Sequence, residues 1–250
     1  MITLFGYPFD QQGLLLFGLV GMLIGMAKVG VNNAGMIAVP ILAILFGGKN
    51  SSGIMLPILI MADLFGVSYY HRHADWSHLK KLLPFAVVGV VIGTLVGENI
   101  NDQLFRLIMG IIVFLSLGIM IWQEKKGSED VPQNQWFAGS IGVLGGITTM
   151  IGNLAGSVMS LYLLAMRMPK NQFIGTAAWF FLVINLIKVP FHVFVWDTIS
   201  VDTFLLDLTL LPVIGLGAFL GLQIVKRIRE KAYRYFIIIM TGVAAIAMIV

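Results

Sequence analysis

The chain has 250 residues and no cysteine. It can therefore form no disulfide, no thiolate metal site and no cysteine nucleophile. Charged residues are also scarce, at 11% of the chain, whereas soluble domains carry about a quarter. No basic cluster with interleaved aromatic residues occurs outside the apolar segments. We therefore predict no metal site, no cofactor and no nucleic-acid partner.

The beginning of the chain lacks positive charge. Residues 1–12 contain neither Lys nor Arg, and no small-residue cleavage site follows the first apolar run, so we expect no signal peptide. What the chain has in abundance is apolar sequence, with 58% hydrophobic residues and a mean hydropathy of +0.94. These nearly continuous apolar segments leave no room for a soluble domain. We predict that residues 1–250 form a single integral membrane domain, all-α in fold.

Two polar, glycine-rich stretches, residues 28–35 and 148–157, interrupt the apolar sequence. The apolar runs beside them are short and cover residues 14–26, 34–46, 136–151 and 154–166. A helix over residues 34–46 would be about 20 Å long, whereas the hydrocarbon core is about 30 Å thick. We predict a broken helix pair at each stretch, in which neither piece spans comfortably alone. The short lengths favour a re-entrant hairpin over two tilted short spans.

The two stretches also match each other in sequence. Ala34 and Gly35 align with Ala155 and Gly156 at an offset of 121 (155 − 34), and later residues align at 128 (212 − 84). The same offsets pair Asn32 with Asn153, Lys49 with Lys170, Asn50 with Asn171, His71 with His192, Pro84 with Pro212, Gly89 with Gly217, Gly93 with Gly221 and Arg106 with Arg234. Chance similarity between leucine- and glycine-rich segments is the alternative, and the coincident polar positions argue against it.

We therefore predict two repeats, residues 13–122 and 136–250, joined by a polar linker over residues 123–135. Each repeat is expected to contain the broken pair followed by three transmembrane helices. In the first repeat the three are residues 53–70, 82–97 and 104–122. In the second repeat residues 173–196 form the first of the three.

The loop charges predict how the repeats are oriented. The loop after the third element is basic in the first repeat and acidic in the second, and the next loop shows the reverse. The residues concerned are Arg72, Lys80, Lys81, Glu98 and Asp102 in the first repeat, and Asp197, Asp202, Lys226, Arg227 and Arg229 in the second. Because positive loops stay inside, equivalent loops should lie on opposite faces. This is the mark of an inverted-topology repeat with both termini outside.

The two interruptions are the predicted binding site. Non-helical backbone at membrane depth is tolerated only where it is buried in protein or lines a cavity. Helix N-termini and close backbone approach at glycines suit an anion, and polar or cationic side chains add hydrogen-bond donors. We predict that the substrate is bound by Lys28, Gly30, Asn32, Asn33, Gly35, Thr149, Gly152, Asn153, Gly156, Ser157, Asn185 and Lys188. Asp63 and His192 are candidates for proton coupling.

Several of these residues have a structural alternative. The glycines can serve close helix packing, and Asn32 or Asn153 can cap the following helix. Lys28 can pair with Asp63 or extend toward the interface, and Lys188 can also reach an interface. His192, like His71, can be interfacial, since it lies at the end of an apolar run. The sequence leaves these alternatives open.

The chain resembles the sulfite exporter TauE/SafE family of bacterial membrane transporters. The second half carries the stronger likeness, in residues 150–156, 162–164, 169–170, 175–181 and 185–190. The first half matches at Gly25, Lys28, Gly30, Ala34, Gly35, Val39 and Pro40. It departs at Asn32 and Asn33, where the family often has glycines, and this bears on the substrate more than on the fold. The resemblance implies transport of sulfite, sulfoacetate or other small sulfonates across the bacterial cytoplasmic membrane.

We predict a secondary transporter, an exporter, that moves a small sulfur-containing anion by alternating access, with protons as a candidate coupling ion. Its partners would be that anion and the lipid bilayer, and the sequence leaves a homodimer open. The alternatives are an anion channel, a carrier of a non-sulfur anion or a cation carrier. An intramembrane enzyme is the rival from another class, but Ser157 lacks the G-x-S-G-like context and nearby histidine of a rhomboid-like protease.

Overall fold

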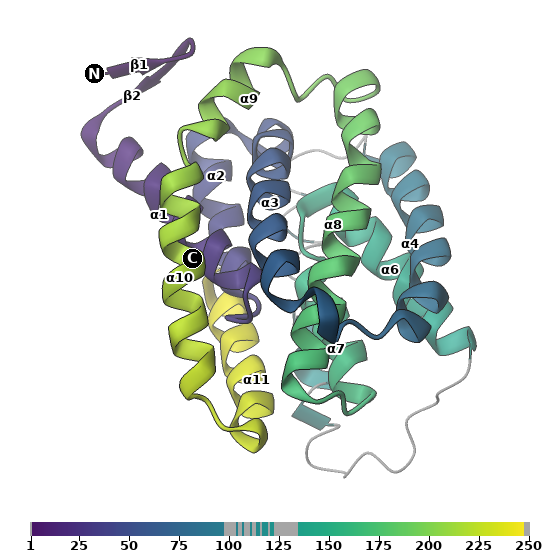
Figure 1. Ribbon diagram of the computed structural model, residues 1–250. Helices are drawn as coiled ribbons and strands as arrows, with labels where there is room; N and C mark the ends of the chain where they lie inside the picture. The colour runs from purple at the N-terminus through teal and green to yellow at the C-terminus, as the bar shows by residue number, and fades with distance from the viewer. Residues whose placement is uncertain are drawn as a thin grey trace.

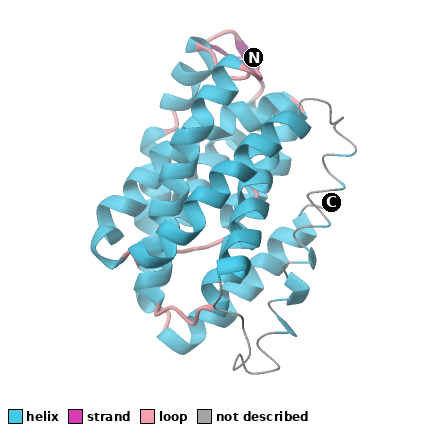
Figure 2. Ribbon diagram, turned by 90° about the vertical axis from the view of Figure 1, so that its right-hand side faces the viewer, coloured by secondary structure: helices cyan, strands magenta, loops and turns pink. Residues whose placement is uncertain are grey.

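The computed structural model describes residues 2–97, residues 135–247 and single positions between 104 and 122 (Figure 1). Most of this part of the chain is helical, as predicted. One exception is an N-terminal hairpin of β1 (Ile2–Leu4) and β2 (Tyr7–Phe9), which the sequence analysis did not predict (Figure 2). Its turn contains Phe5 and Gly6, both with positive φ, as two-residue hairpin turns require.

The helices follow the predicted order. Their bounds are α1 Gln11–Lys28, η1 Ala34–Ile37, α2 Ala38–Phe46, α3 Gly48–Tyr70, η2 His71–His73, α4 Trp76–Gly97, α6 Gln135–Gly152, α7 Ala155–Ala165, α8 Lys170–Phe194, α9 Val201–Leu208, α10 Leu211–Arg227 and α11 Glu230–Ala247. Within the described ranges, four helices are long and apolar enough to cross a membrane, and a fifth span results if α9 and α10, bent by 48°, count together. The predicted span 104–122, nearly all of the linker 123–135, and Glu98 and Asp102 lie outside the described residues.

Each broken pair folds back on itself. The end of α2 returns to the beginning of α1, where the Phe17 and Phe46 rings are 5.8 Å apart. The beginning of α6 likewise meets the end of α7, with the Phe137 and Tyr162 rings 5.9 Å apart. Each pair is therefore a helical hairpin with its break at the tip.

The length of α1 corrects one prediction. This helix has 18 residues and measures about 27 Å, so it can span alone, whereas we predicted that neither piece could. It begins before the apolar run because the Asp10 carboxylate accepts a hydrogen bond from the Gly13 N–H at 2.7 Å and caps the helix. The polar Gln11 and Gln12 then form its first turn.

The two long helices α3 and α8 run antiparallel through the middle of the molecule (Figure 1). Gly66 of α3 faces Ala178 of α8, and Gly175 faces the end of α3 at Tyr70. The pairs α1–α10 and α4–α6 flank this centre on opposite sides.

These flanking pairs exchange helices between the two halves of the chain. In each pair, glycines press so closely against the facing backbone that an added Cβ would collide with a carbonyl oxygen. The contacts are Gly25 with Ile214, Gly217 with Met22, Gly146 with Ala86 and Gly89 with Val143. These contacts are equivalent at the two offsets. An offset of 121 takes the α1 residue to α6, and an offset of 128 takes the α10 residue back to α4, so the Gly25–Ile214 contact corresponds to Gly146–Ala86 and Met22–Gly217 to Val143–Gly89.

The basic loops gather at one end of the molecule (Figure 1). The Lys170 ammonium donates to the Ile228 carbonyl at 2.7 Å, and the Arg234 guanidinium donates to the Leu164 carbonyl at 3.0 Å. Lys226 lies 5.2 Å from the centre of the Tyr69 ring. The ends of α3, α7 and α10 therefore meet there, while β1, β2 and α9 lie at the other end.

Candidate functional site

Both predicted interruptions are present, and each turns through a left-handed asparagine. Asn33 has φ 67° and Asn153 has φ 56°, and asparagine adopts this region more readily than most residues. Gly30, at φ 117°, adds a second left-handed residue to the first break. α6 therefore ends directly before Asn153, whereas α1 ends at Lys28, two residues before Gly30.

The asparagines of the first break bind neighbouring helices. The Asn32 amide donates to Ser160 Oγ of α7 at 2.9 Å, and the Asn33 amide donates to Thr241 Oγ1 of α11 at 2.6 Å. Asn33, which precedes η1, makes no side-chain cap, and Leu154, which precedes α7, makes none either. Asn32 and Asn153 bond to Ser160, Ser52 and Lys188 instead, so the structure shows neither of them as a cap of the following helix.

Lys28 and Asp63 form a buried ion pair, with Nζ 2.8 Å from Oδ1. The Asp63 side chain is fully buried and that of Lys28 is 9% exposed. Gly66, one turn after Asp63, brings α3 against the Lys28 carbonyl, and the Lys28 ammonium lies 4.2 Å from the centre of the Phe181 ring. The pairing alternative is thus confirmed for Lys28.

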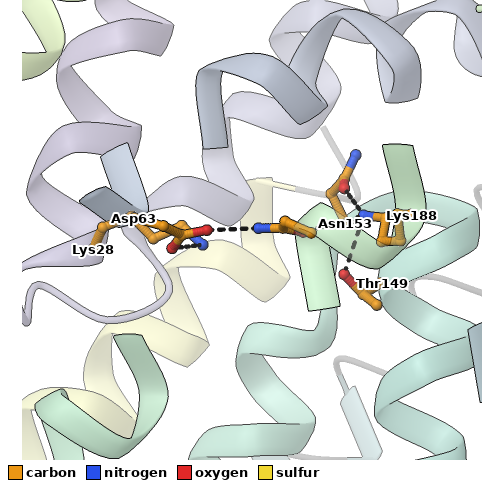
Figure 3. Close-up of polar contacts among 6 residues, drawn as sticks. Lys28, Asp63, Thr149, Asn153 and Lys188 are labelled. Atoms are coloured by element: carbon orange, nitrogen blue, oxygen red, sulfur yellow. Dashed lines mark hydrogen bonds and ion pairs between the residues drawn. The ribbon is translucent and has the colours of Figure 1, made fainter. Parts of the chain in front are cut away.

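A second buried lysine continues this polar network from α8. The Asn185 amide donates to Asp63 Oδ2 at 2.7 Å, and Lys188 donates to Asn185 Oδ1 at 3.4 Å. Lys188 also donates to Asn153 Oδ1 and, at 3.3 Å, to Thr149 Oγ1 (Figure 3). Lys188 is 0% exposed, so the interfacial alternative is wrong for it. The network therefore connects Lys28, at the end of α1, with the second break.

Asn153 joins the second break to α3. Its Oδ1 accepts from Lys188, while its Nδ2 donates to the Ser52 carbonyl at 3.1 Å and to Ser52 Oγ at 3.2 Å. The sequence analysis missed Ser52, Ser160 and Thr241 as partners of the break residues. Thr241 is the single hydroxyl residue in the apolar part of α11, and Ser160 lies one turn after Ser157 in apolar α7; a polar residue within an apolar helix is the signal that could have found them.

A cavity of about 50 Å³ lies between the two breaks. Its walls come from both breaks, from α3 and from α8. Of the predicted substrate-binding residues, eight line it, namely Lys28, Asn32, Asn33, Gly35, Thr149, Asn153, Gly156 and Asn185. A cavity of this size holds a few water molecules or a small anion rather than a drug-sized molecule.

The other four predicted binding residues lie beside the cavity or behind its wall. Gly30 packs against Ile174 and Val225, and its carbonyl accepts a hydrogen bond from the Tyr233 hydroxyl at 2.9 Å. Gly152 is the last residue of α6, and the Ser157 hydroxyl donates to the Leu154 carbonyl at 3.4 Å. Lys188 lies behind Asn153 and Asn185.

A family model described as the sulfite exporter TauE/SafE matches residues 13–248, nearly the whole chain. The chain belongs to the sulfite exporter TauE/SafE family. No curated protein sequence matches it. The resemblance predicted from the motifs is thereby confirmed, and the polar network and its cavity lie within a multi-pass transporter of the TauE/SafE family.

The two proton-coupling candidates occupy different places in this TauE/SafE chain. Neither is among the residues that line the cavity, but Asp63 bonds to Lys28 and Asn185, which do, whereas His192 lies one helical turn beyond Lys188 on α8. His192 Nδ1 is 2.8 Å from Thr198 Oγ1, and its ring centre is 5.0 Å from that of Trp196. His192 is fully buried, so the interfacial alternative is wrong for it, whereas His71 is exposed.

Proposed function

We propose that this TauE/SafE chain is a secondary transporter that exports a small sulfur-containing anion, such as sulfite or a sulfonate, through the cavity between the two breaks. The observation that carries the proposal is that residues of both breaks line one cavity together with the Lys28 ammonium. An ammonium and several amide groups are donors, which suit an oxyanion. The family supplies the class of anion.

The anion would bind Lys28 and the side-chain amides that line the cavity. The start of α7 adds backbone donors, because Gly156 lines the cavity and Leu154 places no side-chain cap on the first N–H groups. Asp63 already holds Lys28, so the anion would compete with a carboxylate for the same ammonium. This competition keeps binding moderate, as release on the other side requires.

Alternating access would come from two inverted halves. The glycine contacts that recur at offsets of 121 and 128 residues support this arrangement. The gathering of the basic loops at one end supports a cytoplasmic location for that end and an outer location for the N-terminal hairpin at the other end. Protons remain a candidate coupling ion, through Asp63 rather than His192, because only Asp63 contacts Lys28.

A binding screen on the purified chain tests this function. Sulfite, thiosulfate, sulfate, sulfoacetate and simple carboxylates are titrated separately, and sulfite is expected to bind most tightly. Uptake into liposomes under imposed ion gradients should then saturate with substrate concentration, as a carrier requires. Binding of carboxylates alone would contradict the sulfur-anion assignment, and flux that rises linearly without saturation would indicate a channel.

A further inference from the structure

The Asn33 side chain has one buried atom that no protein group satisfies. Its Oδ1 has no hydrogen-bond partner among the residues that the structure describes, and the residue is only 4% exposed. Buried polar atoms are rarely left without a partner, because the missing hydrogen bond costs roughly 1–3 kcal/mol. Asn33 also lines the cavity, so a ligand there can supply the missing donor.

The orientation of the Asn33 amide is fixed by its neighbour. The Thr241 hydroxyl donates to the Ile237 carbonyl at 2.8 Å, so toward Asn33 it must act as an acceptor. The Asn33 nitrogen therefore faces Thr241, at 2.6 Å. The oxygen faces Gly156 at the start of α7, where an added Cβ would lie 2.8 Å from it. With a flipped amide, the Thr241 hydroxyl could bond to Asn33 only by giving up its hydrogen bond to the Ile237 carbonyl.

The charges around the cavity set the charge of the ligand. α1 contributes Lys28, α3 contributes Asp63 and α8 contributes Lys188, which sum formally to +1. The sum stays +1 if a proton passes from Lys188 to Asp63. The sequences of η1, α6 and α7 contain no charged residue, the charges of α11 lie at its start beside Leu164, and His192 lies beyond Lys188. One negative charge neutralises this site, whereas a dianion would leave a buried negative charge.

Both observations select a monoanion that carries a proton. The sulfite dianion and the deprotonated sulfonates offer only acceptor oxygens, so they leave Asn33 Oδ1 unsatisfied. Building on the proposed function, we infer that the site takes hydrogensulfite in preference to the sulfite dianion, with Asn33 Oδ1 accepting its proton in a hydrogen bond. One proton would then leave the cell with each hydrogensulfite, bound to the substrate itself and separate from any proton that Asp63 carries.

Titration of the full-length purified chain with sulfite over a range of pH tests this inference. Methanesulfonate is the control probe, since it is a monoanion with no proton to donate and its charge is constant over the same range. The apparent affinity for sulfite should fall by about tenfold per pH unit once hydrogensulfite deprotonates. Affinity for methanesulfonate should stay flat, which corrects for titration of the protein.

Variants of Asn33 and Asn32 separate the acceptor from the rest of the site. Asn33→Gly keeps the left-handed backbone accessible but removes the oxygen, and it should lower the preference for hydrogensulfite over methanesulfonate by about tenfold. Asn32→Ala, which leaves that oxygen in place, should keep the preference. Sulfite affinity that is flat or rises with pH, or an unchanged preference in Asn33→Gly, would overturn the inference while the proposed transport stands. Failure of both anions to bind the wild type would overturn the proposed function and this inference with it.

Discussion

The two breaks share a left-handed asparagine in the backbone but differ in the side chains around it. Each contains a left-handed asparagine and sits at the tip of a helical hairpin. In the first half the lysine stands on the helix before the break and its acid stands on α3. In the second half Thr149 occupies the position equivalent to Lys28, and the lysine is Lys188 on α8. Both breaks therefore contribute to the cavity, while the side chains that they present to it differ.

The asparagines show the same difference. Asn153 is satisfied at both ends, by Lys188 and by Ser52. Asn33 uses its nitrogen on Thr241 but leaves its oxygen without a partner in the described part of the chain. The second break is therefore held by the protein, whereas the first break keeps an acceptor for a ligand. Changes on the two sides should have unequal effects on anion binding.

The largest effect is expected from Lys28→Met, because Lys28 is the ammonium that lines the cavity. Sulfite affinity, measured by calorimetry, should fall by roughly a hundredfold or more, as for the loss of a buried charged partner. Lys80→Met on exposed α4 surface is the matched control and should bind normally. Because Lys28→Met leaves Asp63 without its cation, the double variant Lys28→Met/Asp63→Asn should recover thermal stability but not binding. Normal binding by the double variant would remove Lys28 from the site.

The glycine contacts predict a matched pair of stability effects. Gly89→Ala and Gly217→Ala place a Cβ against the carbonyls of Val143 and Met22, so each should destabilise the protein by about 1–3 kcal/mol. Gly18→Ala is the control, since nothing lies within 4 Å of its added Cβ. Thermal unfolding in detergent measures all three. A large loss in only one of the two variants would break the equivalence of the halves.

Lys188→Met should weaken sulfite binding by about tenfold, the equivalent of one hydrogen bond. The effect is smaller than that of Lys28→Met because Lys188 acts through Asn153 and Asn185 and does not line the cavity. The ratio of the two affinities, measured in the same buffer, is the test. Equal losses for the two lysines would show that the chemistry is as symmetric as the backbone.

The smallest effects are expected from the serine partners. Ser160→Ala removes the acceptor of the Asn32 amide and should weaken sulfite binding by about fivefold. Ser52→Ala should have less effect, because the Ser52 carbonyl still accepts from Asn153. Titration of both variants against sulfite would sharpen the comparison. A greater loss in Ser52→Ala would place the more sensitive asparagine in the second break.

Local sequence predicted the helical membrane class, the two interruptions and the third helix of each half. These features could be predicted because each depends on the hydropathy, or on the glycine and asparagine content, of a single stretch of sequence. The interactions that complete the site join residues far apart in the chain, such as Asn33 with Thr241 or Lys188 with Thr149. Nothing in a local pattern selects those partners, so the choice between pairing and interfacial roles for the lysines stayed open until packing was known.

The break residues show a further limit of sequence alignment. The offset of 121 places Asn32 on Asn153, yet the left-handed residue of the first break is Asn33. The two breaks differ by one residue because η1 begins directly after Asn33, whereas Leu154 separates Asn153 from α7. Residue identity therefore pairs Asn32 with Asn153, whereas backbone conformation pairs Asn33 with Asn153.

The exchanged glycine contacts tie the two halves of the chain together. Separating the chain at its midpoint would pull apart carbonyls and glycines that touch along α1–α10 and α4–α6. The two flanking pairs are therefore mixed in origin, each made from one helix of either half, with α3 and α8 between them. Under the proposed alternating access, each mixed pair would shift as a unit against α3 and α8, which carry Asp63 and Lys188.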